Sequence, residues 1–164
     1  MNHSALPYRP CAGIMLINAD NKVFVGQRLD TTLEAWQMPQ GGIDEGEDAQ
    51  TAAIRELGEE TGIAPDKVEL VAVAPQELYY DLPEDMIGKV WKGKYRGQVQ
   101  RWFLYRFLGT DADIDIATDH QEFRAWRWLD PQQLPGVIVP FKRDLYQRVL
   151  EAFDDYLPGP MPQL

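Results

Sequence analysis

The chain has 164 residues, of which 45% are hydrophobic and 26% are charged. This balance is typical of a soluble globular domain and excludes a disordered or fibrous chain. The 26 Asp and Glu residues outnumber the 16 Lys and Arg residues, and the net charge of −10 disfavours extended contact with DNA or any nucleic acid body. We expect a single domain over residues 1–164, with an ordered core at about 8–157 and a flexible tail at 158–164.

Cysteine content and apolar runs indicate where the protein works. Cys11 is the one cysteine, so no internal disulfide can form, which suits a reducing compartment. The apolar stretch at residues 13–17 is far short of the ~20 residues that cross a bilayer. Residues 1–10 carry no basic segment followed by an apolar run, so no secretory signal is expected. The sequence therefore predicts a cytoplasmic protein with no membrane partner.

Runs of β-branched and aromatic residues, separated by turn residues, predict a sheet of several strands. The turn at Asp20 and Asn21 joins the first two strands into a hairpin. A further short strand is expected near Trp36, inside a loop rich in turn residues. The main strands are expected at residues 8–19, 23–28, 68–80, 98–108 and 123–129.

Two segments have the composition and periodicity of helices. Residues 48–61 are rich in Ala, Leu and Glu, and Gly62 suits the left-handed position that follows a helix. Residues 141–156 carry apolar side chains at helical spacing, and the prolines after them cannot continue the helix. Helices at two places among the strands predict an α/β fold, an α/β/α sandwich with a mixed central sheet.

Acidic residues gather on one face of the first predicted helix. On a wheel of about 100° per residue, Glu59 and Glu60 lie about 60° and 40° to either side of Glu56. Like charges at these spacings, near the C-terminal end of a helix, destabilise it, so their accumulation indicates a functional site. Oxygen ligands of this kind select Mg²⁺ or Mn²⁺. The alternative is a solvated acidic face.

The segment around these glutamates fits a longer pattern, Gly-x5-Glu-x7-Arg-Glu-(apolar)-x-Glu-Glu-x-Gly-(apolar). Seven fixed identities coincide by chance on the order of once in 10⁸ starting positions. This is the signature box of the Nudix hydrolases, and the sequence resembles that family without a gap across the box. The matching positions are Gly41, Glu47, Arg55, Glu56, Leu57, Glu59, Glu60, Gly62 and Ile63.

The Nudix resemblance implies hydrolysis of a nucleoside diphosphate linked to another group, by attack of water on phosphorus. It implies a divalent metal cofactor, Mg²⁺ or Mn²⁺, with Glu56, Glu59 and Glu60 as ligands. It also implies that Arg55 bridges back to Glu47 and supports the loop against the helix. The metal would polarise phosphoryl oxygens and make hydroxide available near neutral pH.

Outside the box, short motifs over residues 8–156 resemble the bacterial RNA pyrophosphohydrolase and dinucleoside polyphosphate hydrolase group. This likeness implies removal of pyrophosphate from the 5′ end of triphosphorylated RNA. The alternative is asymmetric cleavage of diadenosine tetraphosphate into ATP and AMP. A nucleotide-binding module without activity is disfavoured, because a pure binder has no need of the carboxylates. The motifs are Tyr8-Arg9-Pro10, Trp36 to Gly42, Gln98 to Phe103, Glu122-Phe123, Trp126-Arg127-Trp128 and Phe141-Lys142-Arg143.

The same resemblance extends the candidate site beyond the box. Glu122 lies on a predicted loop, where it would complete the metal site or remain a solvated carboxylate. The sequence leaves open whether Glu59, Glu122 or another group is the general base, and whether a protein partner activates the enzyme. An acidic enzyme needs local cations for phosphate, and aromatic rings can stack on a base. The candidates for these two substrate-binding roles are Arg9, Arg28, Lys142 and Arg143, and Tyr80 and Phe141.

Overall fold

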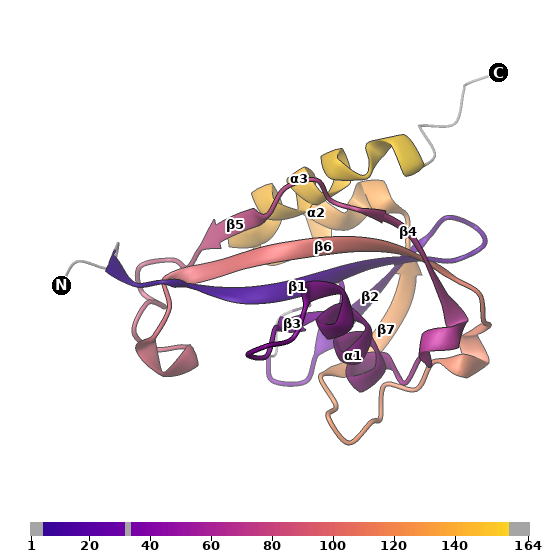
Figure 1. Ribbon diagram of the computed structural model, residues 1–164, viewed down its shortest axis with the longest axis horizontal. Helices are drawn as coiled ribbons and strands as arrows, with labels where there is room; N and C mark the ends of the chain where they lie inside the picture. Colours follow the sequence, from indigo (N-terminus) through magenta and orange to yellow (C-terminus); the bar gives the residue numbers. More distant parts are fainter. Residues whose placement is uncertain (1–4, 32–33, 158–164) are drawn as a thin grey trace.

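Seven strands form one mixed sheet at the centre of the computed structural model, which describes residues 5–31 and 34–157 (Figure 1). Five of them lie in the order β4-β6-β1-β2-β7, while β3 pairs with β1 and β5 pairs with β6. The long central strands β1 and β6 are parallel to each other, and the other pairs are antiparallel. The strands are β1 Tyr8–Ile17, β2 Val23–Arg28, β3 Gln40–Gly42, β4 Val68–Val73, β5 Leu78–Asp81, β6 Gly97–Phe107 and β7 Phe123–Leu129.

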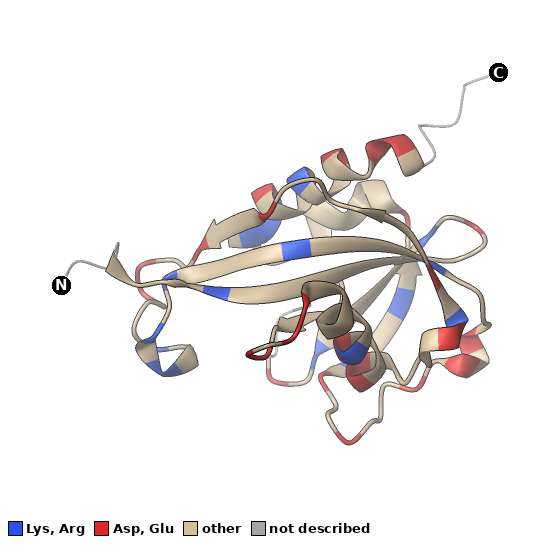
Figure 2. Ribbon diagram, viewed as in Figure 1, with Lys and Arg blue, Asp and Glu red and all other residues tan. Residues whose placement is uncertain are grey.

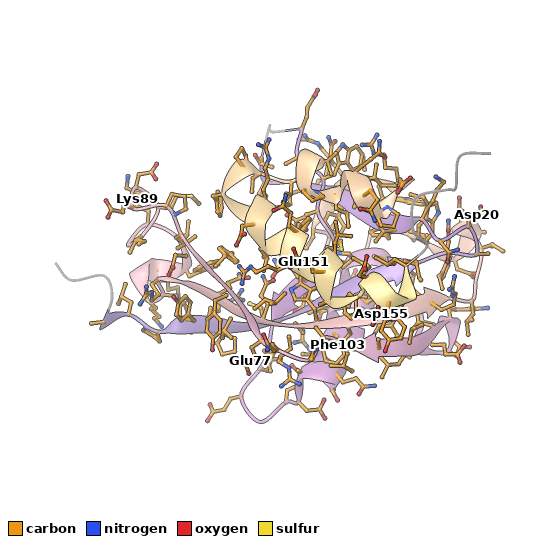
Figure 3. The ribbon with its side chains drawn as sticks, turned by 90° about the horizontal axis from the view of Figure 1, so that it is seen from above. Asp20, Glu77, Lys89, Phe103, Glu151 and Asp155 are labelled. Atoms are coloured by element: carbon orange, nitrogen blue, oxygen red, sulfur yellow. The ribbon has the colours of Figure 1, made fainter. Side chains whose placement is uncertain are left out.

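Helices cover both faces of the sheet, so the predicted α/β/α sandwich is confirmed. In Figure 1 α1 lies below the sheet and α2 and α3 lie above it. Figure 3, seen from above, shows α3 with its labelled Glu151 lying across the strands. None of the helices among the described residues is long and apolar enough to cross a membrane. The helices are α1 Ala49–Thr61, α2 Leu134–Val137 and α3 Arg143–Ala152.

Local signals in the sequence set the ends of α1. The Asp48 side chain accepts a hydrogen bond of 2.7 Å from the backbone N–H of Thr51, which satisfies a donor that has no partner within the helix. Gly62 ends the helix with a φ of 70°, a left-handed conformation that glycine adopts without strain. Both ends therefore match the prediction to within one residue.

Three predicted elements differ from the structure. The strand expected at 68–80 is two strands, because the chain leaves the edge of the sheet at Pro75, which has no N–H for pairing. The short strand is β3 rather than a strand near Trp36, and Gln37 makes only an isolated bridge to Gly26. The last helix is split into α3 and two 3₁₀ turns, Pro140–Lys142 and Asp154–Tyr156. The tail expected at 158–164 lies outside the described residues.

Two apolar layers hold the helices against the sheet. Leu57 of α1 packs with the side chains of β1 and β6 that point to the lower face, among them Ile14 and Phe103. On the other face Val149 of α3 packs against a layer that contains Trp102 of β6. Each such buried side chain contributes roughly 1.5–3 kcal/mol relative to exposure. These layers fix the box helix and the central strands, which position the candidate site.

Candidate active site

A cavity of about 250 Å³ opens where the box helix, the start of β1 and the end of β2 come together. Its lining is polar and carries both signs of charge, with three carboxylates and three cations. Such a mixture suits a ligand that is itself anionic and is bound together with metal ions. The lining residues are Arg9, Arg28, Gln37, Gln40, Gly41, Gly42, Glu56, Glu60, Tyr80, Trp91, Gln98, Glu122 and Lys142.

Two box glutamates line this cavity in an environment that disfavours their charge. Glu60 is 3% exposed, and its Oε2 atom is buried without a hydrogen-bond partner among the described residues. Burial, followed by the charges of Glu56 and Glu122, raises the pKa of Glu60 well above its usual range. Burial also raises the pKa of Glu56, although the nearby guanidinium of Arg55 opposes this shift. A cation bound between them would offset the free-energy cost of removing both charged carboxylates from water.

Strand β3, which precedes α1, approaches Glu56 so closely at Gly41 that no side chain fits there while Glu56 keeps its place. A Cβ added to Gly41 would lie 2.1 Å from the Glu56 carboxyl carbon. The motif's first glycine therefore leaves room for a carboxylate, and any larger residue would push Glu56 out of its place.

Arg55 holds the box loop against the helix through several carboxylates. Its Nε and Nη2 atoms donate to the two Glu47 oxygens at 2.9 and 2.8 Å, the bridge that the resemblance implied. Its Nη1 atom donates to Glu56 at 2.8 Å and to Glu59 at 3.3 Å, and Nη2 also reaches the Gly42 carbonyl at 2.9 Å. Arg55 is the main reason that the pKa of Glu47 falls to about 2. Arg55 thus orients Glu56, whereas Glu59 lies on its outer side.

The cavity's cations come from separate elements. Arg28 at the end of β2 donates through Nε and Nη2 to the Asp30 carboxylate, at 2.8 and 2.5 Å. Lys142 is half-buried, with its Nζ atom 5.2 Å from the centre of the Tyr80 ring. Burial, together with the positive charge of Arg28, lowers the pKa of Lys142 to about 8. This lysine therefore loses its positive charge at a lower pH than an exposed lysine does.

Arg9, the third cation, lies at the start of β1 beside an aromatic wall. Its guanidinium carbon is 5.7 Å from the centre of the Trp91 ring, and its Nη1 atom donates to the Cys11 sulfur at 3.5 Å. Burial raises the pKa of the Cys11 thiol to about 11, so the thiol stays neutral beside the arginine. Neither the Trp91 ring nor the neutral thiol cancels the positive charge of Arg9, so its guanidinium can still bind an anion.

A more apolar pocket of about 380 Å³ adjoins the polar cavity and shares Arg28, Gln37, Tyr80, Trp91 and Lys142 with it. The centres of the Tyr80 and Phe141 rings lie 6.0 Å apart. Aromatic and aliphatic walls beside a charged cavity suit a nucleobase whose phosphates occupy the charged part. Its other lining residues are Asp30, Thr31, Leu82, Met86, Val90, Val139 and Phe141.

The structure brings together most of the residues predicted from the sequence. Seven of them line the polar cavity: Arg9, Arg28, Glu56, Glu60, Tyr80, Glu122 and Lys142. Phe141 lines the neighbouring pocket, whereas exposed Arg143 at the start of α3 lines neither. Glu47, Arg55 and Glu59 form the supporting network outside the cavity.

The four predicted metal ligands do not form one tight cluster. Within residues 5–31 and 34–157, no group of three or more His, Cys, Asp or Glu side chains is arranged to hold a metal ion unaided. The donor set still fits a hard cation, because Mg²⁺ takes one or two carboxylates and completes its shell with water and substrate phosphate. Glu60, with its unpartnered oxygen, and Glu56 provide two such carboxylates.

Sequence reasoning gave no role to four residues of the cavity, Gln37, Gln40, Trp91 and Gln98. Trp91 lies in the loop between β5 and β6, which carried no periodic signal. Gln98 was detectable in principle, since it alternates with Gln100 and Trp102 on one face of a predicted strand. Amides on an otherwise buried face need partners, and that need could have marked them.

The fold and this site define a known class of protein. The family model described as "NUDIX domain" matches residues 7–149, and the chain belongs to the Nudix family. Among the solved structures, a dihydroneopterin triphosphate pyrophosphohydrolase of E. coli superposes with a TM-score of 0.67 at 20% identity, over 87% of this chain and 96% of that chain. An Ap4A hydrolase of C. elegans gives a TM-score of 0.64 at 22% identity, over 91% and 99%. These two likenesses show the shared fold.

Relatives with higher identity share one description. A protein described as RNA pyrophosphohydrolase in Sphingopyxis alaskensis is 65% identical to this chain over 153 residues, which cover 93% of this chain and 97% of that protein. Another with that description in Dinoroseobacter shibae is 57% identical over 154 residues, covering 94% and 96%. The chain is therefore a Nudix hydrolase of the type that acts on phosphoanhydride bonds.

Proposed function

We propose that this enzyme is an RNA pyrophosphohydrolase, which removes pyrophosphate from the 5′ end of triphosphorylated RNA. The observation that carries the proposal is the pairing of a charged cavity with an adjoining apolar pocket. The charged cavity suits a triphosphate, and the apolar pocket suits the base of a nucleotide attached to it. The relatives described as RNA pyrophosphohydrolase support the same substrate. This substrate and the single buried thiol of Cys11 support a cytoplasmic location.

The cations of the cavity would bind the triphosphate. Arg9, Arg28 and Lys142 all line it, and arginine presents a planar fork that matches two phosphate oxygens. Asp30 holds Arg28 through two hydrogen bonds, which reduces the freedom that Arg28 loses when it binds phosphate. The three side chains would fix the position of the phosphorus atom that water attacks.

Glu56 and Glu60 would hold the divalent cation that Nudix hydrolases use, and we propose Mg²⁺ as the metal. When bound, the cation polarises phosphoryl oxygens and lowers the pKa of water. Arg55 keeps Glu56 turned toward the cavity, at 2.8 Å from its Oε1 atom. Glu59 contacts Arg55 through Oε2 at 3.3 Å and does not line the cavity, so we give it a supporting role.

Glu122 is our proposed general base. It lines the cavity and is exposed, whereas Glu59 lies outside the cavity and forms an ion pair with Arg55. In the proposed reaction a water oxygen attacks phosphorus while Glu122 accepts the water proton. The α–β anhydride bond breaks, pyrophosphate leaves with the bonding electron pair, and the RNA keeps a 5′ monophosphate. The geometry favours Glu122 because it is the most exposed of the three carboxylates that line the cavity.

The test compares two substrates with the same purified enzyme and Mg²⁺. We expect a short 5′-triphosphorylated RNA to yield pyrophosphate and a 5′-monophosphorylated product, with a higher kcat/KM than diadenosine tetraphosphate gives. A kcat/KM that strongly favours the dinucleotide would instead assign the enzyme to asymmetric dinucleoside polyphosphate cleavage. A protein that hydrolyses neither substrate with Mg²⁺ or Mn²⁺ would contradict both assignments.

A further inference from the structure

Three polar side chains of β6 form a hydrogen-bonded chain that ends at the cavity. Gln98, Gln100 and Trp102 alternate along the strand and therefore point to the same face, where they are 2%, 1% and 1% exposed. The Trp102 Nε1 atom donates to Gln100 Oε1 at 2.7 Å. The Gln100 Nε2 atom donates in turn to Gln98 Oε1 at 2.6 Å.

The direction of this chain is fixed by chemistry. An indole N–H can only donate, so the Gln100 atom that faces Trp102 must be its carbonyl oxygen. Gln100 then presents its Nε2 atom to Gln98, which must accept through Oε1. An isolated glutamine amide can be turned either way, but here the orientation of Gln98 follows from that of Trp102. Gln98 lines the cavity, so its Nε2 atom is the donor left for a ligand.

Packing holds the indole that sets this direction. Gly13 of β1 lies opposite Trp102, and a Cβ added to Gly13 would lie 2.6 Å from the indole ring. On its other side the indole meets the edge of the Tyr146 ring, with centroids 6.2 Å apart. The Tyr146 hydroxyl is itself fixed, since it accepts a hydrogen bond of 2.8 Å from the Met38 backbone N–H. The indole therefore keeps one orientation.

The other end of the chain lies between two residues of the charged cavity. Gln98 is in register with Arg9 on β1 and with Tyr80 on β5. Residues in register on neighbouring strands have adjacent side chains on the same face, and all three line the cavity. The Gln98 amide thus presents a neutral donor next to a cation proposed to bind phosphate.

We propose that Gln98 donates a hydrogen bond to a phosphate oxygen of the substrate, and that Gln100 and Trp102 are positioning residues that keep its Nε2 atom turned toward the cavity. This inference rests on the proposed function only in taking the ligand to be a polyphosphate. A donor that is oriented before the ligand arrives needs no reorganisation on binding. Without the chain, Gln98 could equally present its oxygen, which repels phosphate.

The test measures binding of inorganic triphosphate by calorimetry, and KM and kcat on 5′-triphosphorylated RNA, for a set of variants. Gln98→Met removes the donor and keeps the length of the side chain, so we expect Kd and KM to rise about tenfold. Trp102→Phe removes the N–H and keeps most of the ring, so we expect a rise of about three- to tenfold. In both variants kcat should stay within about threefold of the parent's, because the lost hydrogen bond acts on binding. A loss of folded protein would give the opposite pattern, a lower apparent kcat with an unchanged KM.

A matched control separates the chain from general damage to the sheet. Trp128 on β7 also donates its indole N–H to a side chain, at 2.8 Å from Asp111 Oδ1, and it does not line the cavity. Trp128→Phe removes a hydrogen bond of the same kind, and KM should not change. A double-mutant cycle adds a second check, because Trp102→Phe in the Gln98→Met background should change Kd less than twofold.

Several results would overturn the proposal. One is a Gln98→Met variant that binds triphosphate as tightly as the parent; another is a Trp102→Phe effect that is equally large when Gln98 is already Met. If Trp102→Phe does not fold, Gln100→Met cuts the chain at its middle and carries the same expectations. A parent that binds triphosphate but does not hydrolyse RNA would contradict the proposed function and still leave this test intact.

Discussion

The carboxylates and the cations of the cavity are built in different ways. Two of the three carboxylates, Glu56 and Glu60, belong to one helix, and Glu56 is placed by the close approach of Gly41 in β3 and by Arg55. The third, Glu122, precedes β7. The three cations come from β1, from β2 and from the 3₁₀ turn before α3. Figure 2 shows Lys and Arg positions spread over strands, loops and helices, and the three cavity cations are residues 9, 28 and 142 of the chain. The two helix carboxylates therefore come from a contiguous motif, whereas Glu122 and the cations are brought to the cavity by the fold.

The two halves should also fail differently when they are mutated. Glu60 is buried and Glu56 is half-buried and held by Arg55, and in the proposed reaction both act on the atoms that change. The cations are more exposed and bind parts of the substrate that are similar in the ground state and the transition state. Carboxylate variants should therefore lower kcat, and cation variants should mainly raise KM.

The largest effect is expected at the buried carboxylates. Glu56→Gln and Glu60→Gln should each lower kcat at least about 100-fold, since groups that merely support a metal ligand already cost 10–100-fold. Glu60→Gln replaces a buried carboxyl group that has an unpartnered oxygen. With a metal chelator present, the variant should therefore unfold at the same or a higher denaturant concentration than the parent. A Glu60→Gln enzyme with the parental kcat would refute the role given to Glu60.

Next in size is the loss of the arginine that orients the carboxylates. Arg55→Lys keeps the charge but cannot bridge Glu47, Glu56 and the Gly42 carbonyl together, so kcat should fall about 10–100-fold. Arg106→Lys is the control, because Arg106 also bonds to a backbone carbonyl at 2.8 Å but does not line the cavity. Equal losses in the two variants would show a general effect on stability instead of a specific one.

Two adjacent residues test the cation half. Lys142→Met should raise KM for triphosphorylated RNA about tenfold, the effect of one charged hydrogen bond, with kcat changed less. Arg143→Met, one position along, should leave KM within about twofold, because Arg143 lines neither pocket. Steady-state kinetics at fixed Mg²⁺ measures both. A larger rise in KM for Arg143→Met than for Lys142→Met would reverse the assignment.

The lowered pKa of Lys142 predicts a pH dependence. The pKa of about 8 means that Lys142 loses its positive charge as the pH rises through that value, so phosphate binding weakens on the alkaline side. The value of kcat/KM, which reports the free enzyme, should fall above about pH 8. Lys142→Arg keeps its charge at all these pH values and should move the fall to higher pH. An unchanged profile in this variant would assign the fall to another group.

The smallest effect concerns stability alone. Asp48→Ala removes the cap at the start of α1 and should lower the free energy of unfolding by about 1 kcal/mol. Measured by urea denaturation, this loss should leave kcat and KM at the parental values, because Asp48 does not line the cavity. A large loss of activity would show that the end of the helix takes part in the site.

The same contrast explains what the sequence could predict. Capping residues, periodicity and the box gave α1 to within a residue, and the contact between Arg55 and Glu47 followed from that motif. The break between β4 and β5 depends on how Pro75 leaves the sheet edge, which periodicity does not encode. Trp91 and Gln98 enter the site only because β5, β6 and β1 lie side by side. Such residues are joined by the topology and not by spacing along the chain.

The most direct test of the account is diffraction at the manganese edge from crystals of the enzyme with Mn²⁺ and a non-hydrolysable triphosphate nucleotide. We predict an anomalous peak within coordination distance of a carboxylate oxygen of Glu56 and of Glu60, next to a phosphate oxygen, with Glu122 facing the same space. A bound nucleotide with no such peak, or a peak held by other residues, would contradict the claim that these buried carboxylates bind the catalytic metal.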